Sequence, residues 1–203
     1  MKPETQGLVD IGKLVLQFAK VNRVTLHEDG ITPESDTDHT VMLYVCACAL
    51  ADALYKDKLD IGKVAQFATV HDLVEVYAGD TNTINISKAG REEKNKKEQE
   101  SFQKIKEQFK DIYPWIHTTI ESYEKLDTSE ARFVKTLDKA MSKVTNTLNK
   151  GAAIKKLGDS QEEMERHFKT QLEEYKGRYG NEFPELMEIL EDLMGSMLHA
   201  MYY

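Results

Sequence analysis

The sequence contains little cysteine and proline and no long hydrophobic run. Two of its 203 residues are cysteines, Cys46 and Cys48, so the chain lacks the disulfide framework of small secreted proteins. Its four prolines and 11 glycines exclude collagen and low-complexity chains. The longest apolar run, Val41 to Ala51, falls short of the ~20 residues that a membrane-spanning helix needs. The first residues contain no signal-peptide core, and we therefore expect a cytoplasmic protein without a membrane segment.

Positive charge is also in short supply. Lysine and arginine number 27 against 35 aspartates and glutamates, which gives a net charge of −8. Because the chain has no basic stripe to neutralise phosphates, we do not expect it to bind nucleic acid. A small phosphate ester is not excluded, since one or two basic side chains and a metal ion are enough to hold it.

Apolar residues recur mostly at intervals of three and four, which is typical of amphipathic helices. We expect a loop over residues 27–38, because this stretch contains five acidic residues, a glycine and a proline. Asp60 can cap a helix that Gly79 ends in a left-handed conformation. The sequence therefore predicts an all-α fold, with helices over residues 8–22, from 37–39 through the apolar run, 61–78, 91–110, from Pro114, 130–148, 161–175 and 184–203.

Four residues suggest chemistry by their type: His39, the pair His71-Asp72, and Asp138. Each falls on a predicted helix or at a helix start, and the three segments that carry them lie far apart in the sequence. Imidazole and carboxylate ligands together suit divalent ions such as Mn, Fe, Co, Ni and Zn. Four protein ligands would leave coordination positions for water and substrate, as in a catalytic metal site.

Two further carboxylates follow the His-Asp pair. Glu75 lies four residues after His71, so a continuous helix would place both on one face, and Asp80 follows Gly79 at the predicted helix end. Clustering acids on a largely apolar helix is costly without a cation. A metal ion would remove that cost.

These residues and their flanking sequence resemble the HD-domain metal-dependent phosphohydrolases, and within them the small 5′-deoxynucleotidases. The matching motifs run in family order over roughly residues 8–148: Asn22-Arg23, Pro33-Glu34-Ser35-x-x-Asp38-His39, His71-Asp72-x-x-Glu75-x-x-x-Gly79-Asp80 and Glu130-Ala131-x-Phe133-Val134-Lys135-x-Leu137-Asp138. The resemblance implies one HD domain over residues 1–203. We expect its core at about 8–148, with residues 159–203 as a C-terminal helical extension packed on it.

The resemblance also implies one divalent ion (Mn, Co, Mg, Zn, Fe or Ni) and hydrolysis of nucleoside 5′-monophosphates. The implied metal ligands are His39, His71, Asp72 and Asp138.

The other site residues surround the metal in this reading. Arg23 is expected to bind phosphate, Glu75 to take or relay a proton, and Asp80 to orient the sugar or a water molecule. Lys88 is a further candidate for substrate binding. Val24 stands where bacterial members of the branch usually carry tryptophan, so the sequence leaves the sugar and the base open.

Three other functions remain open at this point. Hydrolysis of a nucleoside triphosphate ranks lower, because Arg23 and Lys88 alone offer few bases for three phosphates. A ligand sensor without activity would be expected to lack groups such as Glu75 and Arg23, and a two-iron oxygenase would need more histidines. The apolar terminal helix, 184–203, is either core or the face of a homodimer.

Overall fold

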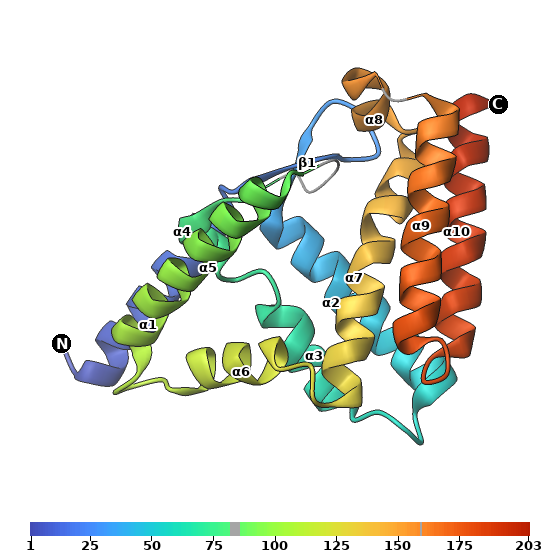
Figure 1. The fold of residues 1–203 in the computed structure, drawn as a ribbon. Coiled ribbons are helices and arrows are strands. Elements are labelled where there is room, and N and C mark those ends of the chain that lie inside the picture. The colour runs from blue at the N-terminus through green and yellow to red at the C-terminus, as the bar shows by residue number, and fades with distance from the viewer. Residues whose placement is uncertain (82–85, 159) are drawn as a thin grey trace.

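The computed structural model describes residues 1–81, 86–158 and 160–203, and it is built mainly from helices (Figure 1). Residue 159, the first of the predicted C-terminal extension, lies outside the described residues, as do residues 82–85. The elements in chain order are α1 (Pro3–Phe18), β1 (Asn22–Leu26), β2 (Pro33–Ser35), α2 (Asp36–Tyr55), α3 (Ile61–Val70), α4 (Glu75–Ala78), α5 (Lys88–Phe109), α6 (Trp115–Glu124), α7 (Ser129–Leu148), α8 (Ala152–Leu157), α9 (Gln161–Tyr179) and α10 (Pro184–Tyr202).

The predicted all-α class is confirmed, with one small addition. β1 and β2 pair as an antiparallel two-stranded sheet within the segment predicted to be a helix end and a loop. Arg23 therefore lies on a strand, and its predicted place at the end of the first helix is wrong. Asp29 closes the connecting turn by accepting hydrogen bonds from the backbone of Ile31 and Thr32.

The start of α2 is fixed by its own side chains. Ser35 caps the helix by accepting from the backbone N–H of Asp38, and the Asp38 carboxylate accepts from the backbone of Ser35. This reciprocal capping box satisfies two backbone donors at once. It sets the first turn of α2, which carries His39.

The helix predicted over 61–78 is interrupted, and this expectation is wrong in its middle. α3 ends at Val70, residues 71–74 form a turn, and α4 begins at Glu75. The sequence contains no glycine or proline at the break. Gly79 does adopt a positive φ of 75°, but its ψ of 152° is extended and not left-handed helical.

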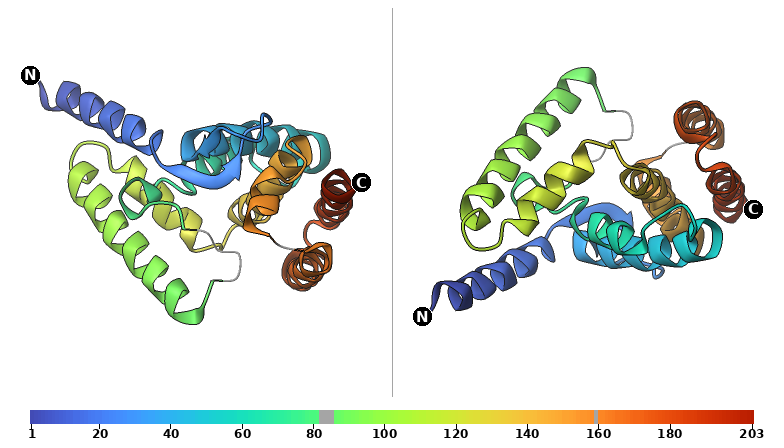
Figure 2. Two further views of the ribbon diagram at one scale, coloured as in Figure 1. Left: turned by 90° about the horizontal axis from the view of Figure 1, so that it is seen from above. Right: turned by 90° about the horizontal axis from the view of Figure 1, so that it is seen from below.

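Among the described residues, three hydrophobic clusters hold the helices together. The largest lies between α2, α3, α7 and α10, and it includes Leu43, Leu137 and Leu190. A second joins α1, α5 and α6. In Figures 1 and 2, α9 and α10 stand on one side, α1 and α5 on the other, and α2, α3 and α7 lie between them.

The terminal helix α10 buries its apolar face inside the chain. Leu186 and Leu190 are fully buried in the largest cluster, and Met194 and Met197 pack with α8 and α9. The residues that suggested a dimer face thus belong to the core of one chain. Among the described helices, none combines the length and apolarity required to cross a bilayer.

Candidate metal centre and active site

The four candidate ligands meet at one point although 99 positions separate the outermost two. His39 comes from the first turn of α2, His71 and Asp72 from the turn after α3, and Asp138 from the middle of α7. One ligand atom from each lies within 4.8 Å of all the others. Two imidazoles and two carboxylates at this spacing could hold one divalent ion.

The hydrogen bonding of His71 shows that the cluster suits a cation. Its Nδ1 donates to the carbonyl oxygen of Ala68 at 2.8 Å, so in the neutral ring Nε2 carries the lone pair. This Nε2 is buried without a hydrogen bond, yet it lies 3.0 Å from Asp72 Oδ2 and 3.8 Å from Asp138 Oδ1. Lone pairs of nitrogen and oxygen face one another here. A shared metal ion satisfies all three atoms.

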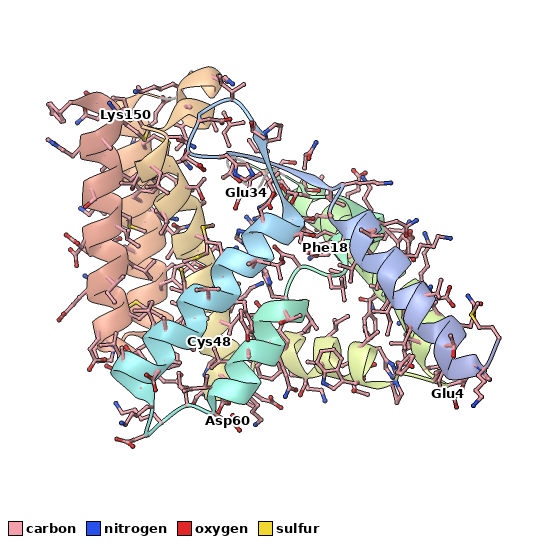
Figure 3. The ribbon with its side chains drawn as sticks, turned by 180° about the vertical axis from the view of Figure 1, so that it is seen from behind. Glu4, Phe18, Glu34, Cys48, Asp60 and Lys150 are labelled. Atoms are coloured by element: carbon pink, nitrogen blue, oxygen red, sulfur yellow. The ribbon has the colours of Figure 1, made fainter. Side chains whose placement is uncertain are left out.

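His39 is held from both sides of its ring. Nε2 lies 3.0 Å from Asp138 Oδ1, and Nδ1 lies 3.6 Å from the carboxylate of Glu34. Glu34 is the middle residue of β2 and is labelled in Figure 3. Glu34 is itself 3% exposed and accepts a short hydrogen bond from the hydroxyl of Thr25. Burial acts to lower the pKa of His39, but Asp138 and Glu34 outweigh it and raise the pKa to about 9. A carboxylate behind a ligating histidine is common in metal sites, where it orients the ring.

Both ligand carboxylates remain ionised. Burial acts to raise the pKa of Asp72, but the electrostatic effect of the adjacent His71 ring, with a smaller one from Arg23, lowers it overall. The pKa of Asp138 is likewise lowered against the effect of burial, mainly by Lys139, whose Nζ lies 2.7 Å from Oδ2. The two carboxylates thus keep the charge that a divalent ion requires.

Arg23 reaches this cluster from β1. Its Nη1 lies 2.9 Å from Asp72 Oδ2, 3.1 Å from Asp36 Oδ1 and 3.9 Å from Glu75 Oε2. All three contacts given by the described residues use Nη1, which leaves the Nε and Nη2 donors available for an anion. Val24, the next residue on β1, points to the opposite face of the strand from Arg23, because neighbouring strand residues alternate between faces. Its side chain is 40% exposed and does not line the cavity described below.

Glu75 lies beside Arg23 at the start of α4, and the turn at 71–74 places it there. It is 3% exposed, and its Oε1 accepts a hydrogen bond from Lys94 Nζ at 2.9 Å. Its Oε2 is buried and accepts none. Burial, followed by the charge of Asp72, raises the pKa of Glu75 to about 9. At neutral pH this carboxyl group can carry a proton, which is the property of a general acid or base.

A cavity of about 750 Å³ opens over these residues, a volume typical of small-molecule sites. Arg23, Glu75 and Asp80 line it together with three of the four candidate ligands. Lys88 is the first residue of α5 and is not among the lining residues. The remaining walls come from α5, α6 and α7, and they include Phe102, Ile120, Lys125, Lys135 and Lys139.

Four residues of this site were not predicted from the sequence: Glu34, Asp36, Lys94 and Lys139. The acid-rich stretch 27–38 was the signal for Glu34 and Asp36. Acidic side chains beside an anion-binding site need a basic group to pair with, and these two contact His39 and Arg23. Asp36 is fully buried against Arg23, and burial raises its pKa to about 6. Lys94 gave no signal, since it lies in a helix with many exposed lysines.

The model of the HD domain family matches residues 16–178. The human protein named 5′-deoxynucleotidase HDDC2 is 32% identical over 136 residues, which are 66% of this chain and 63% of that protein. Its mouse counterpart is 33% identical over 135 residues, 65% of this chain and 64% of that one. These alignments thus span less than two thirds of the relatives' length.

The fold has a close counterpart among solved structures. A protein of Magnetospirillum magnetotacticum, described as a predicted metal-dependent phosphohydrolase, superposes with a TM-score of 0.77. The superposition covers 97% of this chain and 94% of the other, at 20% identity. At that identity the likeness concerns the fold.

Proposed function

Because the chain belongs to the HD domain family, we propose that it is a metal-dependent phosphohydrolase that releases phosphate from nucleoside 5′-monophosphates. The observation that carries the proposal is the convergence of two histidines and two aspartates beside Arg23 and Glu75 at the floor of one cavity. The names of the human and mouse relatives support a 5′-nucleotidase activity.

The proposed residues divide the work. His39, His71, Asp72 and Asp138 hold the ion, which when bound polarises a phosphoryl oxygen and lowers the pKa of water. Arg23 donates from Nε and Nη2 to the phosphate and stabilises the negative charge that builds on it. Glu75 holds or transfers a proton at Oε2, the oxygen without a hydrogen bond. Asp80 lines the cavity where it can contact the sugar or a water molecule.

Hydrolysis of a nucleoside triphosphate remains the second candidate. The cavity holds more bases than the sequence suggested, because Lys94, Lys125, Lys135 and Lys139 join Arg23. Seven acidic side chains line the same cavity, and the six besides Glu75 already offset these five positive charges. Since three phosphates carry more charge than one, the balance favours a monophosphate.

The remaining alternatives find less support. Arg23 and Glu75, which a sensor without activity would not need, both lie beside the metal cluster. Within the described residues the cluster contains two histidines, and His117 is not part of it. This favours a single ion over a two-iron centre.

A phosphate-release screen tests the function directly. Metal-stripped protein is supplied with Mn, Co, Mg, Zn, Fe or Ni, and each nucleoside mono- and triphosphate is assayed for phosphate, pyrophosphate and triphosphate. We expect phosphate from monophosphates. Absence of turnover with all substrates and metals would refute the proposal.

Ligand variants separate metal binding from turnover. His71→Ala and Asp72→Ala are expected to abolish metal uptake and phosphate release, because each removes a ligand. Glu75→Ala should keep the metal and lose about 100-fold or more of kcat, the usual contribution of a general acid or base. Metal content by elemental analysis and initial rates measure both. Wild-type turnover in Glu75→Ala would remove this residue from the mechanism.

We also propose that the protein is cytoplasmic and forms a homodimer. Cys46 and Cys48 are free thiols, which suits a reducing compartment, and cell fractionation tests this. The exposed apolar side chains of Leu16, Val41 and Val45 on α1 and α2 support an interface there. A monomeric mass by light scattering at micromolar concentration would refute the dimer.

A further inference from the structure

Glu75 has a partner outside the motifs around the metal cluster. Lys94, in the second turn of α5, places its Nζ 2.9 Å from Glu75 Oε1 and 2.7 Å from Glu98 Oε1. The lysine side chain is 18% exposed, against 53% for Lys97 on the same helix. Lys94 is thus a largely buried ammonium group shared between two carboxylates.

The position of α5 is fixed independently of this ion pair. The hydroxyl of Ser101 donates a short hydrogen bond to the carbonyl oxygen of Val74, the residue before Glu75. Tyr77 on α4 also donates to Gln108 at 3.2 Å. Ile105 and Phe109 of α5 pack with Val74 in the second hydrophobic cluster. Lys94 therefore stands on an element that is rigidly joined to the segment carrying Glu75.

The charges around Glu75 explain why it needs such a partner. Asp72, Asp80 and Asp36 all act on it unfavourably, and burial removes the water that would screen them. Arg23 Nη1 lies 3.9 Å from Glu75 Oε2. Lys94 Nζ, on α5, is closer to the carboxyl group, at 2.9 Å from Oε1. Because Lys94 holds Oε1, rotation of the Glu75 carboxyl group is restricted. Oε2 then stays without a hydrogen bond on the side of Arg23 and the candidate metal ligands.

We propose that Lys94, anchored by Glu98, is a positioning residue that orients the Glu75 carboxylate for proton transfer. The inference rests on the proposed hydrolase function. The competing role, direct contact with the substrate phosphate, is disfavoured because two of the three N–H donors of Lys94 are already used by carboxylates.

The test compares Lys94→Gln, Lys94→Arg and the control Lys97→Gln in the metal-loaded protein of 203 residues. Lysine and glutamine have similar helix propensities, so α5 should be retained. We expect Lys94→Gln to lower kcat about 10- to 100-fold, the loss typical of a misplaced group, with KM and metal content unchanged. Lys94→Arg should recover most of kcat. Lys97, which among the described residues pairs with Glu93 at the surface, should be dispensable.

A double-mutant cycle with Glu75→Gln distinguishes the two roles of Lys94. If Lys94 acts through Glu75, adding Lys94→Gln to Glu75→Gln leaves kcat unchanged within about twofold. Additive losses, or a raised KM for the monophosphate, would instead show direct phosphate contact and overturn the inference. So would full activity in Lys94→Gln.

The outcomes also separate this inference from the proposed function. If wild-type protein releases no phosphate from any nucleotide, the function itself is wrong. If wild type is active and Lys94→Gln matches it, only the positioning role is lost. Unfolding temperature and metal content, measured on every variant, identify a loss of activity that comes from misfolding. If Lys94→Gln misfolds, Lys94→Arg and Glu98→Gln test the positioning role instead. Glu98→Gln should lower kcat, because it loosens the anchor of Lys94.

Discussion

At the scale of single residues, the site is distinguished by buried charges that satisfy one another. Thr25, Glu34 and His39 form one chain of contacts, and Lys94, Glu75 and Arg23 form another. Unpaired, any of these groups would be costly at such low exposure. Both series of contacts end at the four candidate metal ligands, so they hold these ligands in place before an ion binds.

Glu34 offers a test of this pre-organisation. Glu34→Gln removes the charge that faces His39 Nδ1, and we expect metal affinity to fall about tenfold, as for other residues that orient a ligand. Titration of metal-stripped protein measures the change. Glu28→Gln, at a 76% exposed carboxylate of the same segment, serves as the control. Equal affinities in the two variants would exclude a role for Glu34.

The raised pKa of His39 predicts how metal binding depends on pH. In the metal-free protein the ring is protonated below about 9, and only the neutral ring binds metal. Affinity should therefore rise with pH up to about 9, by at most about tenfold per unit for this proton, and flatten above. Calorimetry in buffers of different ionisation enthalpy should detect proton release near pH 7. Binding without proton release would contradict the protonated state.

At the scale of elements, short local structures place the ligands more than the long helices do. The capping box of α2 sets His39, the turn at 71–74 sets His71 and Asp72, and the strand β1 sets Arg23. The turn has no breaker in its sequence. A neighbouring helix hydrogen-bonds to its backbone, because the hydroxyl of Ser101 on α5 donates to the carbonyl oxygen of Val74.

The capping boxes of α2 and α9 allow a matched experiment. Ser35→Ala at α2 and Ser160→Ala at α9 should each lower the free energy of unfolding by about 1 kcal/mol, the usual effect of losing a cap. Only Ser35→Ala should also weaken metal binding, because α2 carries His39. Urea unfolding and metal titration measure the two quantities. Equal metal affinities would show that the cap does not position the ligand.

At the scale of the whole molecule, the metal cluster joins three elements that the core also joins. α2, α3 and α7 contribute both to the largest hydrophobic cluster and, directly or through the turn after α3, to the ligands. An ion that binds only the folded chain must therefore stabilise it globally.

Metal addition should raise the unfolding temperature of stripped protein. An ion at 1,000 times its Kd contributes about 4 kcal/mol to the free energy of unfolding. Scanning calorimetry with and without chelator measures the shift. The shift should vanish in His71→Ala and remain in Lys97→Gln, whose side chain lies away from the cavity. A shift that persists in His71→Ala would place the ion elsewhere.

Much of this protein could be predicted from the sequence, because its information is local. Apolar spacing predicted α7 within one residue of each end, and the residue types and order of His39, His71-Asp72 and Asp138 predicted the metal cluster. Helix periodicity and ligand chemistry are properties of short segments, so they can be read without the fold.

The contacts between these segments were decided only by the tertiary structure. It interrupted the predicted helix at residues 71–74, drew Arg23 onto a strand, gave the acids of 27–38 their separate partners, and brought Lys94 to Glu75 from α5. Each of these outcomes depends on contacts between distant segments. Burial then turns ordinary carboxylates and lysines into paired charges, and burial is a property of the packed molecule and not of any local sequence.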